Sequence, residues 1–237
     1  MFIFYKLILG HLIADFFLQF EELYRFKLRS SIGHLAHALV HFATCLLALF
    51  PYLDRPFIWI FVGLISAIHF LQDSLKYSLQ EKYPRARFPI FVLDQIFHIL
   101  FLASILLFPI SQLKVGFSPE LPALNILYLE EPWTKLALVF FVTTVGGSYL
   151  LHNFRKSYFP TTSRHDHGIT TFEILHAAFE RTWITTAFAT LSFTPLLALS
   201  PAVGLLRLPS ARLRNVLDFI LSFLYAAVVG LLAREFI

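Results

Sequence analysis

The first hundred residues contain histidine and aspartate in pairs whose members are four positions apart. The pairs are His11 with Asp15, His37 with His41, His69 with Asp73, and Asp94 with His98. In a helix this spacing places both side chains on one face, about 6 Å apart. Each pair lies in its own hydrophobic segment. Four helices that each direct two such groups inward are what a buried metal or proton-handling site requires.

Imidazole and carboxylate ligands together suit a divalent metal, with Zn²⁺ the best fit and Mn²⁺ or Fe²⁺ as alternatives. The candidate ligands are His11, His37, His41, His69, His98, Asp15, Asp73 and Asp94. The three aspartates are also candidate general bases. Lys76, three residues after Asp73, could pair with Asp73 or contact an anionic head group of a substrate. The alternative is a purely structural network of hydrogen bonds between helices.

The composition indicates a membrane protein. Of 237 residues, 57% are hydrophobic, 14% are charged and 28 are phenylalanine, whereas a soluble domain carries about 25% charged residues. We therefore expect an all-α integral membrane protein, a polytopic helical bundle of about seven spanning helices within a range of six to eight. The net charge of +4 comes from short clusters between hydrophobic segments. It indicates membrane topology rather than binding to nucleic acid.

The hydrophobic segments divide the chain into three regions. Residues 1–110 are expected to form a four-helix membrane unit that carries the histidine and aspartate cluster. Residues 111–132, with several prolines and acidic residues, are expected to form an extracytoplasmic loop. Residues 133–237 are expected to supply the C-terminal membrane helices. One of these is a candidate for a broken or interfacial helix, because Glu180 and Arg181 interrupt its apolar sequence and prolines follow.

The distribution of basic residues predicts an orientation. The first segment covers residues 2–20, and the loop Glu21–Arg29 that follows it holds Arg25, Lys27 and Arg29. Basic clusters also follow the third and fifth segments, so we expect the N-terminus outside and the main basic loops in the cytoplasm of a bacterial inner membrane. Counting about 1.5 Å per residue from the cytoplasmic helix ends then predicts two layers of polar groups. The deeper layer contains His11, His41, His69 and His98, and the other contains Asp15, His37, Asp73 and Asp94.

The motifs of this region resemble those of a bacterial membrane family catalogued as domain of unknown function 3307. The family pattern H-L-x-A-D-F-x-x-Q corresponds to His11–Gln19, and H-x3-H corresponds to His37–His41. H-x3-D-x2-K corresponds to His69–Lys76, and D-Q-x2-H corresponds to Asp94–His98. The resemblance implies a shared membrane-embedded site. No established activity comes with the family.

Three functions are compatible with this pattern. The first is a membrane-embedded metal-dependent hydrolase or transferase that acts on a lipid or lipid-linked substrate at the cytoplasmic leaflet, because mixed histidine and aspartate ligands favour hydrolysis by a Lewis acid. The second is a small ion-coupled or proton-coupled transporter that uses the same cluster as a relay. The third is a non-catalytic membrane scaffold. Metal content, flux and tolerance of alanine substitutions distinguish them.

Overall fold

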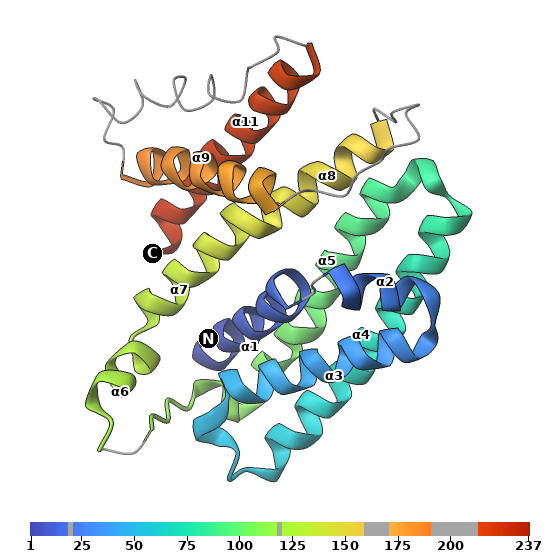
Figure 1. Ribbon diagram of the computed structural model, residues 1–237. Helices are drawn as coiled ribbons and strands as arrows, with labels where there is room; N and C mark the ends of the chain where they lie inside the picture. The colour runs from blue at the N-terminus through green and yellow to red at the C-terminus, as the bar shows by residue number, and fades with distance from the viewer. Residues whose placement is uncertain (19–20, 118–119, 159–170, 191–212) are drawn as a thin grey trace. The chain divides into compact units, whose positions relative to one another are not determined.

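The computed structural model describes residues 1–18, 21–117, 120–158, 171–190 and 213–237, and the regular elements in these ranges are all helical (Figure 1). The chain forms two compact units, residues 1–138 and 139–237. Five helices in the described ranges are long and apolar enough to cross a membrane, namely Ser31–Ala48, Pro56–Lys82, Pro84–Leu107, Glu131–Tyr158 and Phe219–Phe236. The protein is therefore an all-helical membrane protein.

The first unit contains most of the helices. They are α1 (Phe2–Leu12), the π-helix η1 (Ile13–Phe17), α2 (Glu21–Arg29), α3 (Ser31–Ala48), η2 (Phe50–Tyr52), α4 (Pro56–Lys82), η3 (Pro84–Ala86), α5 (Arg87–Ala103), η4 (Ser104–Leu107), η5 (Pro109–Gln112), α6 (Pro122–Leu129) and the greater part of α7 (Glu131–Phe141). Helix α3 packs against α1, α2 and α4, and α5 packs against α4 and α1. The helices α1, α3, α4 and α5 therefore enclose a common interior.

Local sequence signals set where α3 and α4 begin. Ser30 caps α3 with an extended backbone, and its hydroxyl accepts a hydrogen bond from the Gly33 amide at 3.1 Å, which satisfies a donor that the first turn would leave unpaired. Pro56 occupies the first position of α4, where its missing amide hydrogen has no cost. Short connections therefore reverse the chain between successive helices of the first unit.

Glycine allows α1 and α3 to approach closely. A Cβ atom added at Gly10 would lie 3.1 Å from both the Cys45 Cα atom and the Thr44 carbonyl oxygen. Small residues at such crossings let helix backbones approach in membranes, where tight packing replaces the hydrophobic effect. Because Gly10 directly precedes His11, this crossing sets the position of His11 relative to α3.

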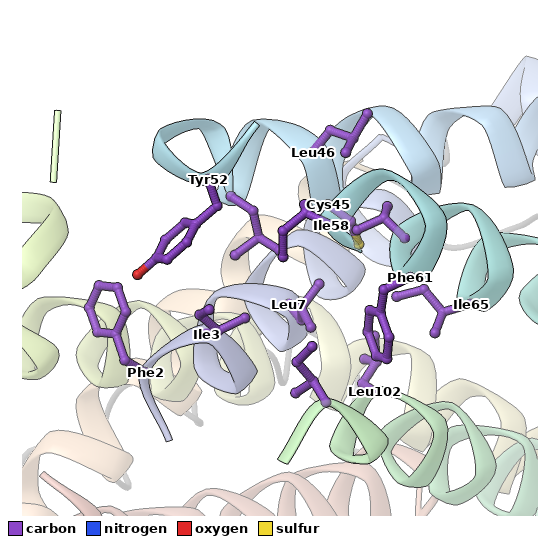
Figure 2. Close-up of a cluster of buried hydrophobic side chains, with 13 residues drawn as sticks. Phe2, Ile3, Leu7, Cys45, Leu46, Tyr52, Ile58, Phe61, Ile65 and Leu102 are labelled. Atoms are coloured by element: carbon purple, nitrogen blue, oxygen red, sulfur yellow. The ribbon is translucent and has the colours of Figure 1, made fainter. Parts of the chain in front are cut away.

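An apolar core fills one end of this interior (Figure 2). It consists of Phe2, Ile3, Leu7, Cys45, Leu46, Leu49, Tyr52, Ile58, Phe61, Val62, Ile65, Leu102 and Ile105. The order along the buried face is the same on α1 and α4. Apolar residues come first, followed by His11 and then Asp15 on one helix and by His69 and then Asp73 on the other. The histidine and the aspartate of each helix thus lie beyond the same apolar layer, within which Lys6 of α1 is also buried and donates to the Thr134 hydroxyl at 2.6 Å.

The structure differs from the sequence-based expectation at two places near the N-terminus. The first segment was expected to be one helix over residues 2–20, but α1 changes into the π-helix η1 at Ile13. Residues 19 and 20 lie outside the described ranges. The basic stretch Glu21–Arg29, expected to connect two spanning helices as a loop, forms α2. It is helical because it packs on α3, a long-range contact that charge alone does not indicate.

The second unit is built on the end of α7, the π-helix η6 (Val142–Gly146), α8 (Gly147–Tyr158), α9 (Thr171–Thr190) and α11 (Leu213–Phe236). Helix α9 packs against η6 and α11. The prolines expected to interrupt a C-terminal helix fall within residues 191–212, which lie outside the described part of the chain. In the second unit, too, the buried side chains include charged and hydroxyl groups, among them Arg181 and Ser148.

Arg181 donates hydrogen bonds to backbone carbonyls of the π-helix η6 in the second unit. Its Nε donates to the Thr143 carbonyl at 2.7 Å, and its Nη2 donates to the Thr144 carbonyl at 2.6 Å. The Tyr225 hydroxyl donates to the Val142 carbonyl at 2.6 Å. A π-helix leaves carbonyl groups without their usual helical partners, and such groups are costly inside a membrane. The guanidinium and the phenol therefore supply additional donors to three consecutive carbonyls of η6, two of which also accept other hydrogen bonds.

Candidate metal centre

The eight residues singled out as candidate metal ligands meet in the interior of the first unit. Helix α1 with η1, and helices α3, α4 and α5, each contribute two of them, and every side chain is buried, with exposed fractions of 1–7%. They are His11, Asp15, His37, His41, His69, Asp73, Asp94 and His98. Burial of this many ionisable groups is expensive unless they pair with one another or bind an ion.

His69 is the centre of an imidazole cluster. Its ring centroid lies 4.3 Å from that of His41, 4.4 Å from His98, 5.1 Å from His37 and 5.6 Å from His11. The His11 and His98 rings stack at 5.0 Å. The four histidines expected in the deeper layer therefore lie in one cluster around His69, and His37, expected in the other layer, adjoins this cluster.

Asp15 lies beside three of these imidazoles. Its Oδ1 is 3.2 Å from the His37 Nε2 and 3.4 Å from the His69 Nε2, and its Oδ2 is 3.8 Å from the His11 Nε2. Asp15 belongs to the π-helix η1, a feature that is frequent at functional sites. The carboxylate is thus enclosed by nitrogen atoms that could share an ion with it.

Lysine side chains form ion pairs with the other two carboxylates, those of Asp73 and Asp94. Lys27 forms an ion pair with the Asp73 Oδ2. Lys76 donates to the Asp73 Oδ1 at 2.6 Å and to the Asp94 Oδ2 at 2.9 Å. Gln95 also donates to the Asp94 Oδ2, at 3.1 Å. The result is an alternating series of charges, Lys27, Asp73, Lys76 and Asp94. Of the two expectations for Lys76, pairing with Asp73 is the one seen.

Two of the histidines form a hydrogen bond through Nδ1, and this bond orients the imidazole ring. His98 Nδ1 lies 2.7 Å from the Asp94 backbone carbonyl. A carbonyl only accepts, so His98 carries its proton on Nδ1 and, when neutral, presents a bare lone pair on Nε2. His41 Nδ1 lies 3.1 Å from the Ser66 hydroxyl. Such outer contacts hold metal-binding imidazoles in place.

Several ring nitrogens in this interior have no hydrogen-bond partner among the described residues. They are both nitrogens of His11, both of His69, Nδ1 of His37 and Nε2 of His98. Two groups bring their donor atoms within 4.8 Å of one another, His11 with His41 and His69, and Asp15 with His37 and His69. A buried polar group without a partner costs about 1–3 kcal/mol. The donor set therefore fits a bound divalent ion, with His69 common to both groups.

Lys27 and Ser66 are the residues that sequence reasoning missed. Lys27 is 2% exposed, whereas the sequence predicts it in a basic loop with Arg25 and Arg29. Burial lowers the pKa of the Lys27 ammonium below its ordinary value, while the neighbouring Asp73 acts in the opposite direction. The available signals were Ser30 and Gly33, which start α3 and permit a close chain reversal. Ser66 precedes His69 by three residues, a spacing that places both on one face.

The fold and the cluster define an all-helical membrane protein with a buried centre of histidine, carboxylate and lysine side chains. Residues 3–120 match a family described as a protein of unknown function, DUF3307. The chain belongs to this family, and the matched range contains every residue of the centre. No curated protein and no solved structure is similar to this chain. The family resemblance expected from the motifs is thereby confirmed.

Proposed function

We propose that the protein is a membrane-embedded metal-dependent hydrolase or transferase that acts on a lipid or lipid-linked substrate. The observation that carries the proposal is the convergence of buried donor atoms around His69. Three imidazoles form one group and two imidazoles with a carboxylate form the other, and several of the nitrogens lack hydrogen-bond partners in the described chain. Zn²⁺ suits both groups, and Mn²⁺ or Fe²⁺ suits the group that contains Asp15.

The charges of the centre also favour a bound cation. Among the described residues, Asp15, Asp73 and Asp94 are opposed by two ammonium groups, those of Lys27 and Lys76. With neutral imidazoles, one negative charge is left in excess, and a buried net charge is costly. A divalent ion would turn this excess into one positive charge, which an anionic group of a substrate would offset. The centre is therefore better balanced with an ion and an anion than without them.

The residues around the ion would have separate roles. A bound divalent ion supplies Lewis acidity and an activated water at neutral pH. His37 would hold Asp15 through the 3.2 Å contact of its Nε2 with Oδ1, and Asp15 is positioned to accept a proton from a group bound nearby. Lys76 would keep Asp73 and Asp94 in place rather than contact the substrate, because both of its carboxylate contacts are within 3 Å.

The surroundings of the centre favour a substrate that comes from the bilayer. The helices α3, α4 and α5 that enclose it present exposed apolar side chains on their outer faces, such as Leu39, Leu71 and Leu100. In a membrane protein such faces contact lipid. Across residues 1–237 we propose seven spans, formed by the five long helices together with α1 and α9. The N-terminus would lie outside a bacterial inner membrane and the main basic loops in the cytoplasm.

A second candidate function is supported by the series Lys27, Asp73, Lys76 and Asp94. His37 links this series to Asp15, since its Nε2 lies 3.2 Å from Asp15 and 3.6 Å from Asp73. Alternating acids and bases inside a membrane are the groups from which proton relays are built. The same residues could therefore serve a proton-coupled or ion-coupled transporter.

One preparation of vesicles distinguishes these functions. Protein loaded with Zn²⁺ or Mn²⁺ is reconstituted into a bacterial polar lipid extract with a pH-sensitive dye inside. A hydrolase or transferase produces a new lipid product, detected by mass spectrometry, that disappears with a chelator and in Asp15→Asn but persists in His34→Ala. His34 is a suitable control because it is half-buried on α3 and its ring faces Tyr77 at 5.2 Å. Unchanged lipid composition would contradict the proposal, and flux that depends on Asp73 would then favour the transporter.

A further inference from the structure

Lys27 reaches the centre from a helix that is not one of the five candidate spans. It belongs to α2, yet its side chain is fully buried and pairs with Asp73. Arg25 and Arg29 on the same helix are exposed. A lysine is rarely buried to this extent unless its charge has a specific partner. The burial of Lys27 therefore points to a role at Asp73.

The two oxygens of Asp73 are divided between two lysines. Lys76 donates to Oδ1 at 2.6 Å, and Lys27 occupies Oδ2. The same Oδ2 lies 3.6 Å from the His37 Nε2, whereas the Asp15 Oδ1 lies 3.2 Å from it. His37 thus has two carboxylates within reach. Because two ammonium groups offset the charge of Asp73, its attraction for His37 is weakened and Asp15 keeps the closer contact.

The chain reversal that places Lys27 beside Asp73 depends on Gly33. A Cβ atom at Gly33 would lie 2.3 Å from the Phe26 carbonyl oxygen and 2.6 Å from the Lys27 amide nitrogen. Real Cβ atoms do not approach backbone so closely, so only glycine lets α2 fold back over the first turn of α3. Ser30 caps that turn by accepting the Gly33 amide hydrogen. Residues 26–33 therefore form a compact structural element whose inner side chain is Lys27.

We propose that Lys27 is a positioning residue of the metal centre. Its ion pair with Asp73 keeps the His37 imidazole in contact with Asp15, which preserves the donor group of Asp15, His37 and His69. This inference rests on the proposed metal function, since it assigns Lys27 a purpose within that site. Without Lys27, the Asp73 Oδ2 loses its ion pair. The His37 imidazole then turns toward this oxygen, and Asp15 loses the contact that orients it. Loss of a group that orients metal ligands typically weakens metal binding 10–100-fold.

The first test measures the affinity of the purified protein for Co²⁺ by chelator competition, together with its visible absorption spectrum. Lys27→Met is expected to weaken Co²⁺ binding about 10–100-fold and to change the spectrum. Lys27→Arg, which keeps the charge, is expected to restore most of the affinity. Arg29→Met is the matched control on the exposed face of α2 and should match the wild type. Gly33→Ala should reproduce the Lys27→Met defect without altering any group of the centre.

A second readout separates failure of this inference from failure of the metal function. In metal-free protein with ¹⁵N-labelled histidine, the His37 ring signals report its hydrogen-bond partner by nuclear magnetic resonance. Lys27→Met should shift these signals, and Arg29→Met should not. If wild type binds no Co²⁺, the metal function falls, and the His37 signals still decide whether Lys27 positions His37. If Lys27→Met leaves both the affinity and the His37 signals unchanged, the role of Lys27 is overturned.

Discussion

The Nε2 atom of His69 lies 3.4 Å from the Oδ1 atom of Asp15, with both side chains buried. His69 is the histidine shared by the two donor groups. Asp15 is the carboxylate that pairs with no lysine in the described part of the chain. The contact therefore joins the imidazole cluster to the acid that remains able to bind an ion.

Replacement of Asp15 should change the choice of metal. Asp15→Asn removes the charged oxygen from the group with His37 and His69 but leaves the group of His11, His41 and His69 intact. Oxygen ligands matter more for Mn²⁺ than for Zn²⁺. We expect Mn²⁺ affinity to fall at least tenfold more than Zn²⁺ affinity, measured by chelator competition. Equal losses for the two metals would show that Asp15 is not a ligand of the bound ion.

Replacement of Asp73 should destabilise the first unit. Asp73→Asn leaves Lys27 buried beside a neutral partner and removes one of the two carboxylate contacts of Lys76. Breaking a buried ion pair on one side costs about 3–5 kcal/mol. Thermal unfolding in detergent should show a large loss, part of which Lys27→Met recovers in the double variant. Asp54→Asn, at a side chain that is 74% exposed, should have no effect. An additive double variant would contradict the pairing.

The pairs four residues apart predicted most of this centre, because spacing and apolar flanks determine which face of a helix each residue occupies. The pairing of Lys76 with Asp73 follows from the same rule. Lys27 and the π-helix around Asp15 could not be predicted in this way. The burial of Lys27 depends on the approach of Phe26 to Gly33, a contact between helices. The π-helix has no distinctive residue pattern in Ile13–Phe17.

The crossing of α1 and α3 supplies a third prediction. Gly10→Ala would place a Cβ atom 3.1 Å from backbone atoms of Thr44 and Cys45, so the helices must separate by a few tenths of an ångström. We expect a loss of about 1–3 kcal/mol and weaker metal binding, since His11 moves with α1. Gly63→Ala is the control, because its nearest contact would be 3.9 Å away. Thermal unfolding that gives the same midpoint for both variants would contradict the close crossing.

Arg181 should stabilise the second unit through the π-helix η6. Arg181→Met removes this donor from the Thr143 carbonyl and the Ser148 hydroxyl, whereas the Thr144 carbonyl still accepts a hydrogen bond from the Ser148 hydroxyl at 3.0 Å. Each unsatisfied buried group costs about 1–3 kcal/mol. Hydrogen exchange at residues 142–148 should accelerate in Arg181→Met, and it should stay at the wild-type rate in Arg234→Met, which alters an exposed arginine on α11. Unchanged hydrogen exchange in Arg181→Met would show that Arg181 does not stabilise η6.

The most direct test of the central claim is elemental analysis of the purified protein after exhaustive dialysis against metal-free buffer. We predict at least one tightly bound Zn, Mn or Fe per chain in the wild type and in the control His34→Ala. His69→Ala, which removes the ligand common to both groups, should reduce the metal to background. His41→Ala and His37→Ala, which each affect one group, should retain more than His69→Ala does. Background metal in the wild type, or full occupancy in His69→Ala, would contradict the claim.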